Sequence, residues 1–231
     1  MIGAVTVRTV AMVAGPLVGL GYLVGTIPWR ILYRRMQLKR DFTLDRVLNA
    51  RRAHGRDDEI PAVLAEAATP LLAAVAVQWW IQTIAPGGRG VFESSSAIAL
   101  HSNQALAVWD STALWFGAAA VFGHIAPVWN RFRGGTGVPP AMGLAVWFAP
   151  WVFVTSVGGY LLALAIVRQR GPAIATGLVV GLTWSWAGWV WELDPAWGVL
   201  HGPELTLWCS VMVALLAPRV LNAPEYSSHS A

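Results

Sequence analysis

The stretch "VPPAMGLAVWFAPWVFVTSVGGYLLALAIV", residues 138–167, decides how many times this chain crosses a membrane. It carries no charged residue, and its length is too great for one membrane helix of about 20 residues and short for two. Its apolar pattern is interrupted by Pro139, Pro140, Pro150 and Gly158–Gly159. Because proline kinks or ends a helix, the stretch is either one broken helix or two short helices that meet near Pro150.

The composition of the whole chain predicts an integral membrane protein. Of its 231 residues 56% are apolar and 12% are charged, and the mean hydropathy is +0.54. Soluble domains carry about 25% charged residues, because their surface faces water. The fourteen tryptophans suit the two membrane interfaces, where an apolar ring with one N–H donor is stable. We therefore expect an all-α membrane protein that binds membrane lipids and no nucleic acid.

The positions of the arginines indicate whether 138–167 crosses the membrane once or twice. Loops rich in Lys and Arg stay in the cytoplasm, and the loop 30–59 holds nine of them. Arg131, Arg133, Arg168 and Arg170 fall on the same side as this loop only if 138–167 crosses twice. The sequence thus predicts a bundle of about seven transmembrane helices, some short or broken, with the N-terminus outside and the C-terminus cytoplasmic.

The predicted spans are about 9–29, 60–84, 104–128, 138–149, 150–167, 171–191 and 204–221. Residues 1–221 then form one transmembrane domain that includes the basic cytoplasmic loop 30–59, and residues 222–231 form a polar tail. Within the loop, apolar and cationic residues follow a helical period. This pattern fits an interfacial helix on anionic lipid headgroups as well as a substrate-binding segment.

A glycine-rich turn, "RFRGGTGVPP" at 131–140, lies on the predicted cytoplasmic side and leads into a helix. Successive glycine N–H groups can point into one concavity and hold an anion, and a helix start adds the positive end of its dipole. Arg131 and Arg133 would add charge-assisted hydrogen bonds to a phosphate. The alternative is a plain flexible turn whose two arginines only fix the topology.

This turn belongs to a longer segment, "GHIAPVWNRFRGGTGV" at 123–138. The segment resembles the signature of the PlsY-type acyl-phosphate:glycerol-3-phosphate acyltransferases, membrane enzymes of bacterial phospholipid synthesis. Upstream, "GYLVGTIPWRILYRR" and "NARRAHGRDDEIPAVLAEAATP" are similar to earlier parts of the family, and "RVLNAPE" is similar to its closing motif. The resemblance covers essentially the whole chain and implies seven spans in the bacterial cytoplasmic (inner) membrane, with a cytoplasmic active site.

Departures from the family pattern concern charge. Thr136 stands where the family has a lysine in its glycine turn, and Thr69-Pro70 replaces a Lys-Gly pair. The first loop lacks the family's glycine-rich run, and the histidine and asparagine before the closing motif are missing. A hydrogen bond to a charged group contributes about 1.5–3 kcal/mol, against about 1 kcal/mol for a neutral one. A site without these lysines is therefore expected to hold fewer phosphate charges.

Two functions remain open. The first is a divergent acyltransferase that moves a fatty acyl group from an activated donor onto a phosphorylated or polyol acceptor, in phospholipid or glycolipid synthesis at the inner leaflet. The second is a catalytically silent relative: a scaffold, a lipid-binding protein or a subunit with a membrane-protein partner. No cofactor and no metal site is predicted.

For the enzyme, the resemblance assigns catalysis to His124 and Glu66, although His124 could equally be a helix-end histidine bonded to backbone. Phosphate or substrate binding is assigned to Asn49, Arg52, Arg131, Arg133, Gly134, Gly135, Thr136, Gly137 and Arg219. We also expect the turn to lie close to Arg52, since both segments share one site in the family.

Overall fold

The computed structural model of the chain describes residues 7–29, 31–33, 60–84, 104–191 and 203–222. Every regular element in these ranges is helical. The helices are α1 (Val7–Gly25), α3 (Ile60–Ile84), α5 (Gln104–Ile125), the short 3₁₀ helix η2 (Val128–Asn130), α6 (Val138–Phe148), α7 (Pro150–Val167), α8 (Arg170–Val190) and α9 (Pro203–Leu221). The prediction of an all-α fold is confirmed for this part of the chain.

Five helical segments in the described ranges are long and apolar enough to cross a membrane. They are Ile60–Ile81, Ser111–Asn130, Pro150–Val167, Arg170–Val190 and Pro203–Leu221. Two shorter apolar segments, Met12–Gly25 and Val138–Phe148, add to them. These helices are those of a multi-pass membrane protein. Seven crossings, and the side on which each terminus lies, stay predictions.

The ambiguous stretch 138–167 consists of two helices. Ala149 leaves the helical conformation with φ −151° and ψ 67°, and α7 begins at Pro150. A proline suits the first position of a helix, because its missing N–H would have no intrahelical partner there. With 11 residues, α6 is about 16 Å long, roughly half the 30 Å hydrocarbon core of a bilayer. The joint between α6 and α7 therefore lies within the bundle's length and not at its end.

Two α-helices end before the limits predicted for their spans, about 29 and 128. The helix α1 ends at Gly25 and α5 ends at Ile125, although the apolar segment Ser111–Asn130 continues through η2. Each end comes two or three residues before a proline, Pro28 or Pro127. The residue before a proline is disfavoured in the helical conformation, so the helix stops ahead of it.

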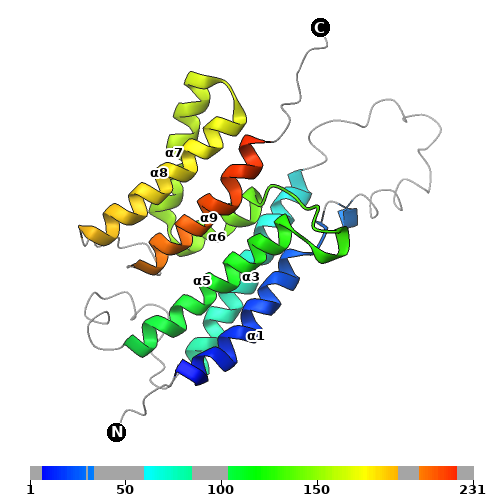
Figure 1. Cartoon of the computed structure of the whole chain (residues 1–231), viewed down its shortest axis with the longest axis vertical. Coiled ribbons are helices and arrows are strands. Elements are labelled where there is room, and N and C mark those ends of the chain that lie inside the picture. Colours follow the sequence, from blue (N-terminus) through cyan, green and yellow to red (C-terminus); the bar gives the residue numbers. More distant parts are fainter. Residues whose placement is uncertain (1–6, 30, 34–59, 85–103, 192–202, 223–231) are drawn as a thin grey trace, which may run out of the picture.

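The bundle has two halves with α6 between them (Figure 1). We call α1, α3 and α5 the first half and α7, α8 and α9 the second half. A single apolar core joins α5, α6 and α9. Its largest fully buried side chains include Phe116 and Leu114 of α5, Leu144 and Phe148 of α6, and Leu216 of α9.

Glycines allow the helices of the first half to pack at backbone distance. A Cβ added to Gly21 or Gly25 of α1 would overlap the carbonyl oxygen of Phe116 or Ala120 in α5. In the reverse direction, a Cβ on Gly123 of α5 would overlap the carbonyl oxygen of Tyr22. Small residues spaced four apart are typical of close helix pairs in membranes, where packing contacts replace the hydrophobic drive.

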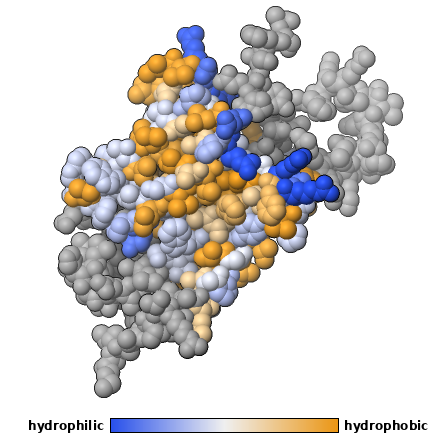
Figure 2. Space-filling view, viewed as in Figure 1, coloured by the Kyte–Doolittle hydropathy of each residue, from blue (hydrophilic) through white to orange (hydrophobic). Residues whose placement is uncertain are grey.

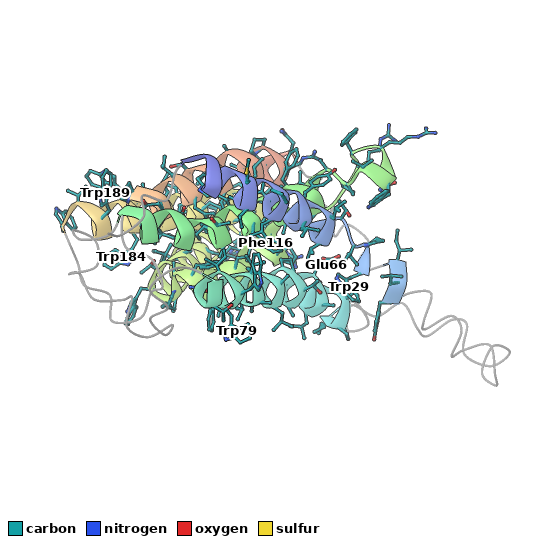
Figure 3. The ribbon with its side chains drawn as sticks, turned by 90° about the horizontal axis from the view of Figure 1, so that it is seen from below. Trp29, Glu66, Trp79, Phe116, Trp184 and Trp189 are labelled. Atoms are coloured by element: carbon teal, nitrogen blue, oxygen red, sulfur yellow. The ribbon has the colours of Figure 1, made fainter. Side chains whose placement is uncertain are left out.

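The two ends of the bundle differ in chemistry. Figure 3 shows Trp184 and Trp189 toward one end and Glu66 and Trp29 toward the other. The arginines whose side chains are described are all exposed: Arg131, Arg133, Arg168, Arg170 and Arg219. They follow α5, flank the α7–α8 connection or end α9, and Figure 2 shows the hydrophilic side chains near these helix ends. The charge pattern of the sequence predicts that the helix ends with these arginines face the cytoplasm.

Candidate functional site

A buried carboxylate and a histidine meet between α3 and α5. Glu66 Oε2 lies 4.0 Å from His124 Nε2, and the two side chains are 4% and 12% exposed. A buried charge is costly unless a partner of opposite charge or a hydrogen bond offsets its desolvation. The sequence assigned Glu66 and His124 to one site, and the structure brings them together.

A proline shapes the helix beside this carboxylate. Pro70 lies inside α3 four residues after Glu66 and is buried. Without an N–H, Pro70 cannot donate the usual helical hydrogen bond to the carbonyl of Glu66, and its ring crowds that carbonyl. The departure from the family pattern at Thr69-Pro70 therefore removes one backbone hydrogen-bond donor from the turn that follows Glu66.

The glycine turn folds back onto His124. The Gly135 N–H donates to the carbonyl of His124 at 3.0 Å, and the Gly134 N–H donates to the carbonyl of Ile125 at 3.1 Å. A Cβ on Gly135 would overlap the imidazole of His124, and one on Gly134 would overlap the His124 carbonyl. A side chain at 134 would therefore meet backbone, and one at 135 would displace the His124 imidazole.

These hydrogen bonds give the two glycines a structural task that the sequence did not reveal. The last carbonyls of a helix lack intrahelical partners and need other donors, and the amides of Gly134 and Gly135 supply them at the end of α5. We expected successive glycine amides to point together into an anion cradle. Two of them instead point at the helix.

The turn leads into α6, as expected. Gly137 precedes the helix with φ +80°, a left-handed conformation that favours glycine. Pro139 and Pro140 have no N–H, and the Val138 N–H lies 3.4 Å from the Thr136 hydroxyl, a long contact. The start of α6 therefore presents fewer amide donors than a typical helix N-terminus.

Of the other predicted binding residues, the structure describes the positions of Arg131, Arg133 and Arg219. Arg131 and Arg133 are exposed beside the turn, and Arg131 has φ 51°. Arg219 is exposed on the last turn of α9, one turn beyond Leu216, and a Cβ on Gly137 would lie 2.7 Å from the Leu216 side chain. Asn49 and Arg52 lie outside the described residues, and so does the expected approach of Arg52 to the turn. Among the described residues no group of three His, Cys, Asp or Glu could hold a metal ion.

A polar brace that the sequence did not predict ties the turn to α1. The Trp129 Nε1–H donates to the Thr26 hydroxyl at 2.7 Å, and this hydroxyl donates to the Leu23 carbonyl at 2.7 Å. The Tyr22 hydroxyl donates to the Ala126 carbonyl at 2.8 Å. The brace joins residues about one hundred positions apart, so no local sequence signal could have indicated it.

An apolar cavity of about 360 Å³ lies among α6, α7, α8 and α9. Its walls include Val138 and Ala145 of α6, Val152 of α7, Leu178 of α8 and Trp208 of α9. It approaches the glycine turn through Leu216, which lines the cavity and packs against Gly137. The polar pair and the cavity thus lie on different sides of the same turn.

Comparison with known proteins agrees with the resemblance in the sequence. The family model described as glycerol-3-phosphate acyltransferase matches residues 16–221. The chain belongs to this family. The resemblance to PlsY-type enzymes is therefore confirmed over nearly the whole length.

Individual relatives are distant. A glycerol-3-phosphate acyltransferase of Anaeromyxobacter dehalogenans (strain 2CP-C) is 26% identical over 208 residues, which cover 87% of this chain and 86% of that protein. One from Chlorobaculum parvum is 30% identical over 177 residues, 72% of this chain and 69% of its own. One from Pseudomonas savastanoi is 40% identical over 70 residues, 29% of this chain and 36% of its own. No solved structure gives a significant match.

Proposed function

We propose that this protein transfers a fatty acyl group from an activated donor to a hydroxyl of glycerol-3-phosphate or a related polyol, at the inner leaflet of the bacterial cytoplasmic membrane. Family membership supports a membrane acyltransferase in phospholipid synthesis. The observation that carries the proposal is the pair of Glu66 and His124, held at 4.0 Å beneath the glycine turn.

The chemistry asks for a base near an acceptor hydroxyl. In the transfer, the hydroxyl oxygen attacks the acyl carbonyl carbon, the bond from that carbon to the donor's leaving group breaks, and the hydroxyl proton leaves. His124 would take this proton, because a positioned histidine is a common general base. Glu66 would favour the imidazolium that results and hold its orientation, as a carboxylate does beside a catalytic histidine.

Phosphate binding would rest on arginines. Arg131 and Arg133 border the turn, and Thr136 adds a neutral hydroxyl. Asn49, Arg52 and Arg219 complete the set implied by the resemblance. With threonines at 69 and 136, the site offers less positive charge than the family pattern. Two substrates that each carry a phosphate repel each other in one site unless cations offset their charge. We therefore infer that a donor or acceptor of lower charge is preferred.

The proposal is tested by acyl transfer in nanodiscs with the purified wild-type protein and the variants His124→Gln and Glu66→Gln. Loss of a general base typically lowers the rate by about 10²–10⁴-fold, and we expect His124→Gln to fall in this range. Thr176→Val, on an exposed position of α8, serves as the control and should retain the wild-type rate. A His124→Gln variant with unchanged turnover would disprove the assignment of the base.

A catalytically silent relative, acting as a scaffold, a lipid-binding protein or a subunit of a membrane complex, is the second candidate. The bonds that occupy the Gly134 and Gly135 amides favour it, because they leave fewer donors for a phosphate. Here the wild-type protein should show no turnover with acyl-phosphate, acyl-thioester or other activated donors, while still binding a phosphorylated lipid. Turnover with any of these donors, abolished in His124→Gln, would exclude this candidate.

A further inference from the structure

The cavity among α6–α9 has one closed end. Along α9 the lining residues run from Leu216, near the glycine turn, to Trp208, which is 3% exposed. On α9, Leu205 lies one turn beyond Trp208, and on α6, Phe148 lies one turn beyond the lining residue Ala145. Both Leu205 and Phe148 are buried in the packed core and do not line the cavity. Trp208 therefore stands at the boundary between the cavity and the filled core.

The other end and one side of the cavity are accessible. Val138 begins α6 directly after Gly137, and Leu216 touches the position of a Gly137 Cβ, so the cavity reaches the glycine turn. Met142 and Leu161 line the cavity and are also exposed on the outside of the bundle. In a membrane this side faces lipid. An apolar molecule can therefore enter from the bilayer with its polar end at the turn.

We propose that this cavity holds the acyl chain during transfer, with the methyl end against Trp208, and that Trp208 limits the length of chain that the protein accepts. The inference rests on the proposed acyl transfer and adds a residue that sets its specificity. It requires no new reaction step.

The dimensions fit part of a fatty acyl chain. The volume of about 360 Å³ is at the small end of the roughly 300–1,000 Å³ usual for ligand pockets. Trp208 and Leu216 are eight residues apart on α9, which corresponds to about 12 Å at 1.5 Å per residue. At about 1.5 Å per C–C bond, and less along the zigzag, this length takes roughly nine or ten carbons.

The chemistry of Trp208 favours a role that depends on its volume. Its Nε1–H is buried and has no hydrogen-bond partner among the described residues. A buried donor without a partner costs free energy, and a phenylalanine or leucine would fill a core position without this cost. What the indole supplies here is size, at the point where the cavity stops.

The first test measures chain-length preference in nanodiscs, with a mixture of acyl donors from octanoyl to stearoyl. One methylene group in an apolar pocket changes selectivity by about 10–200-fold. Trp208→Phe should shift the optimum to slightly longer chains and Trp208→Leu further, with at least a tenfold gain in the ratio of long to short products. Ala145→Phe, which narrows the cavity, should shift the optimum to shorter chains. Val146→Phe, on the exposed neighbouring position of α6, should leave the profile unchanged.

The second test does not need turnover. A photoreactive 1-acylglycerol-3-phosphate, with a diazirine near the methyl end of its chain, is crosslinked to the protein in nanodiscs, and the labelled segments are identified by mass spectrometry. We expect label between Trp208 and Met212 and near Val152, its loss in Ala145→Phe, and its retention in Val146→Phe. A phosphatidylglycerol with the same diazirine, given as bulk lipid, should label mainly the exposed surface and label this cavity much less than the 1-acylglycerol-3-phosphate does.

The outcomes separate the two proposals. Equal labelling of the cavity by bulk phosphatidylglycerol, label confined to the first half, or an unchanged length profile in Trp208→Leu would overturn the acyl-chain assignment. Cavity labelling by the 1-acylglycerol-3-phosphate without any turnover would leave the binding site in place and overturn the proposed catalysis alone. Thermal unfolding of each variant shows whether it is folded, and Trp208→Phe, the smallest change, keeps the length test valid if Trp208→Leu is unstable.

Discussion

The first half of the bundle buries polar side chains and the second half almost none. Among the described residues, the buried polar or charged positions in or directly after α1, α3 and α5 are Thr26, Glu66, Gln78, Ser111 and Thr112. In α7, α8 and α9 the corresponding set is Ser185 alone. In addition, Gln78 accepts a hydrogen bond from Trp147 of α6 at 2.9 Å. Polar groups inside a membrane protein are costly and usually functional, so this contrast supports the proposal that proton chemistry lies in one half and the apolar substrate in the other.

The strongest test of this division is Gly135→Ala. The added methyl would overlap the His124 imidazole and displace the proposed base. A displacement of about 1 Å in an active site can cost about 10²-fold in rate, and we expect at least this loss in the nanodisc assay. Gly158→Ala in α7 is the matched control, because a Cβ there has no neighbour within 4 Å. Equal activity of the two variants would show that the turn does not position His124.

Charge at the turn provides the next test. Restoring lysines with Thr69→Lys and Thr136→Lys should raise the rate with acyl-phosphate and glycerol-3-phosphate by about tenfold or more, since a charge-assisted hydrogen bond adds about 1 kcal/mol or more over a neutral one. The wild-type protein should be slow with this substrate pair. Fast wild-type turnover that the double variant does not improve would contradict the charge argument.

Glycine-to-alanine substitutions should destabilise the first half more than the second half. Gly25→Ala places a methyl on the backbone of Ala120, which cannot move aside, whereas Gly181→Ala in α8 meets the Ser156 hydroxyl, which can rotate. Overpacking costs typically 1–3 kcal/mol, so we expect a drop of several degrees in Tm for Gly25→Ala and a smaller one for Gly181→Ala. Gly19→Ala, with no neighbour within 4 Å of the added Cβ, should melt like the wild type. The reverse order would mean that the α1–α5 contact is not tight.

The brace at Trp129 should give the smallest effect. Trp129→Phe removes the hydrogen bond to Thr26, which contributes about 0.5–1.5 kcal/mol, and keeps most of the ring. We expect a rate reduction of a few-fold, because the turn is still held by the Tyr22 bond. Thr26→Ser keeps the hydroxyl and should behave like the wild type in the same assay. A Trp129→Phe loss as large as that of Gly135→Ala would make the brace part of the catalytic arrangement.

The sequence was sufficient for features that depend on local composition. Apolar runs bounded by prolines and arginines predicted the helices, and Pro150 predicted the break between α6 and α7. The pairing of Glu66 with His124 came from the resemblance to a family, since the two residues lie on different helices. The bonds of Gly134 and Gly135 to the end of α5 depend on how the turn folds back, and the contact of Trp129 with Thr26 depends on the register of α1 against α5. Helix register in a membrane is set by packing of small residues, which a hydropathy pattern does not contain.

Met142 and Leu161 are exposed at the side of the cavity. The donor concentration that controls the rate would therefore be its concentration within the bilayer. For an acyl donor that enters from the lipid, the effective concentration is the number of donor molecules per lipid molecule and not per volume of water. At a fixed total amount of acyl donor, adding inert lipid to the vesicles should slow the reaction as the donor becomes sparser in the bilayer, while dilution of the vesicle suspension with buffer should not. Saturation would then be expressed as a mole fraction in the membrane, and the composition of the surrounding bilayer would itself regulate flux through the site.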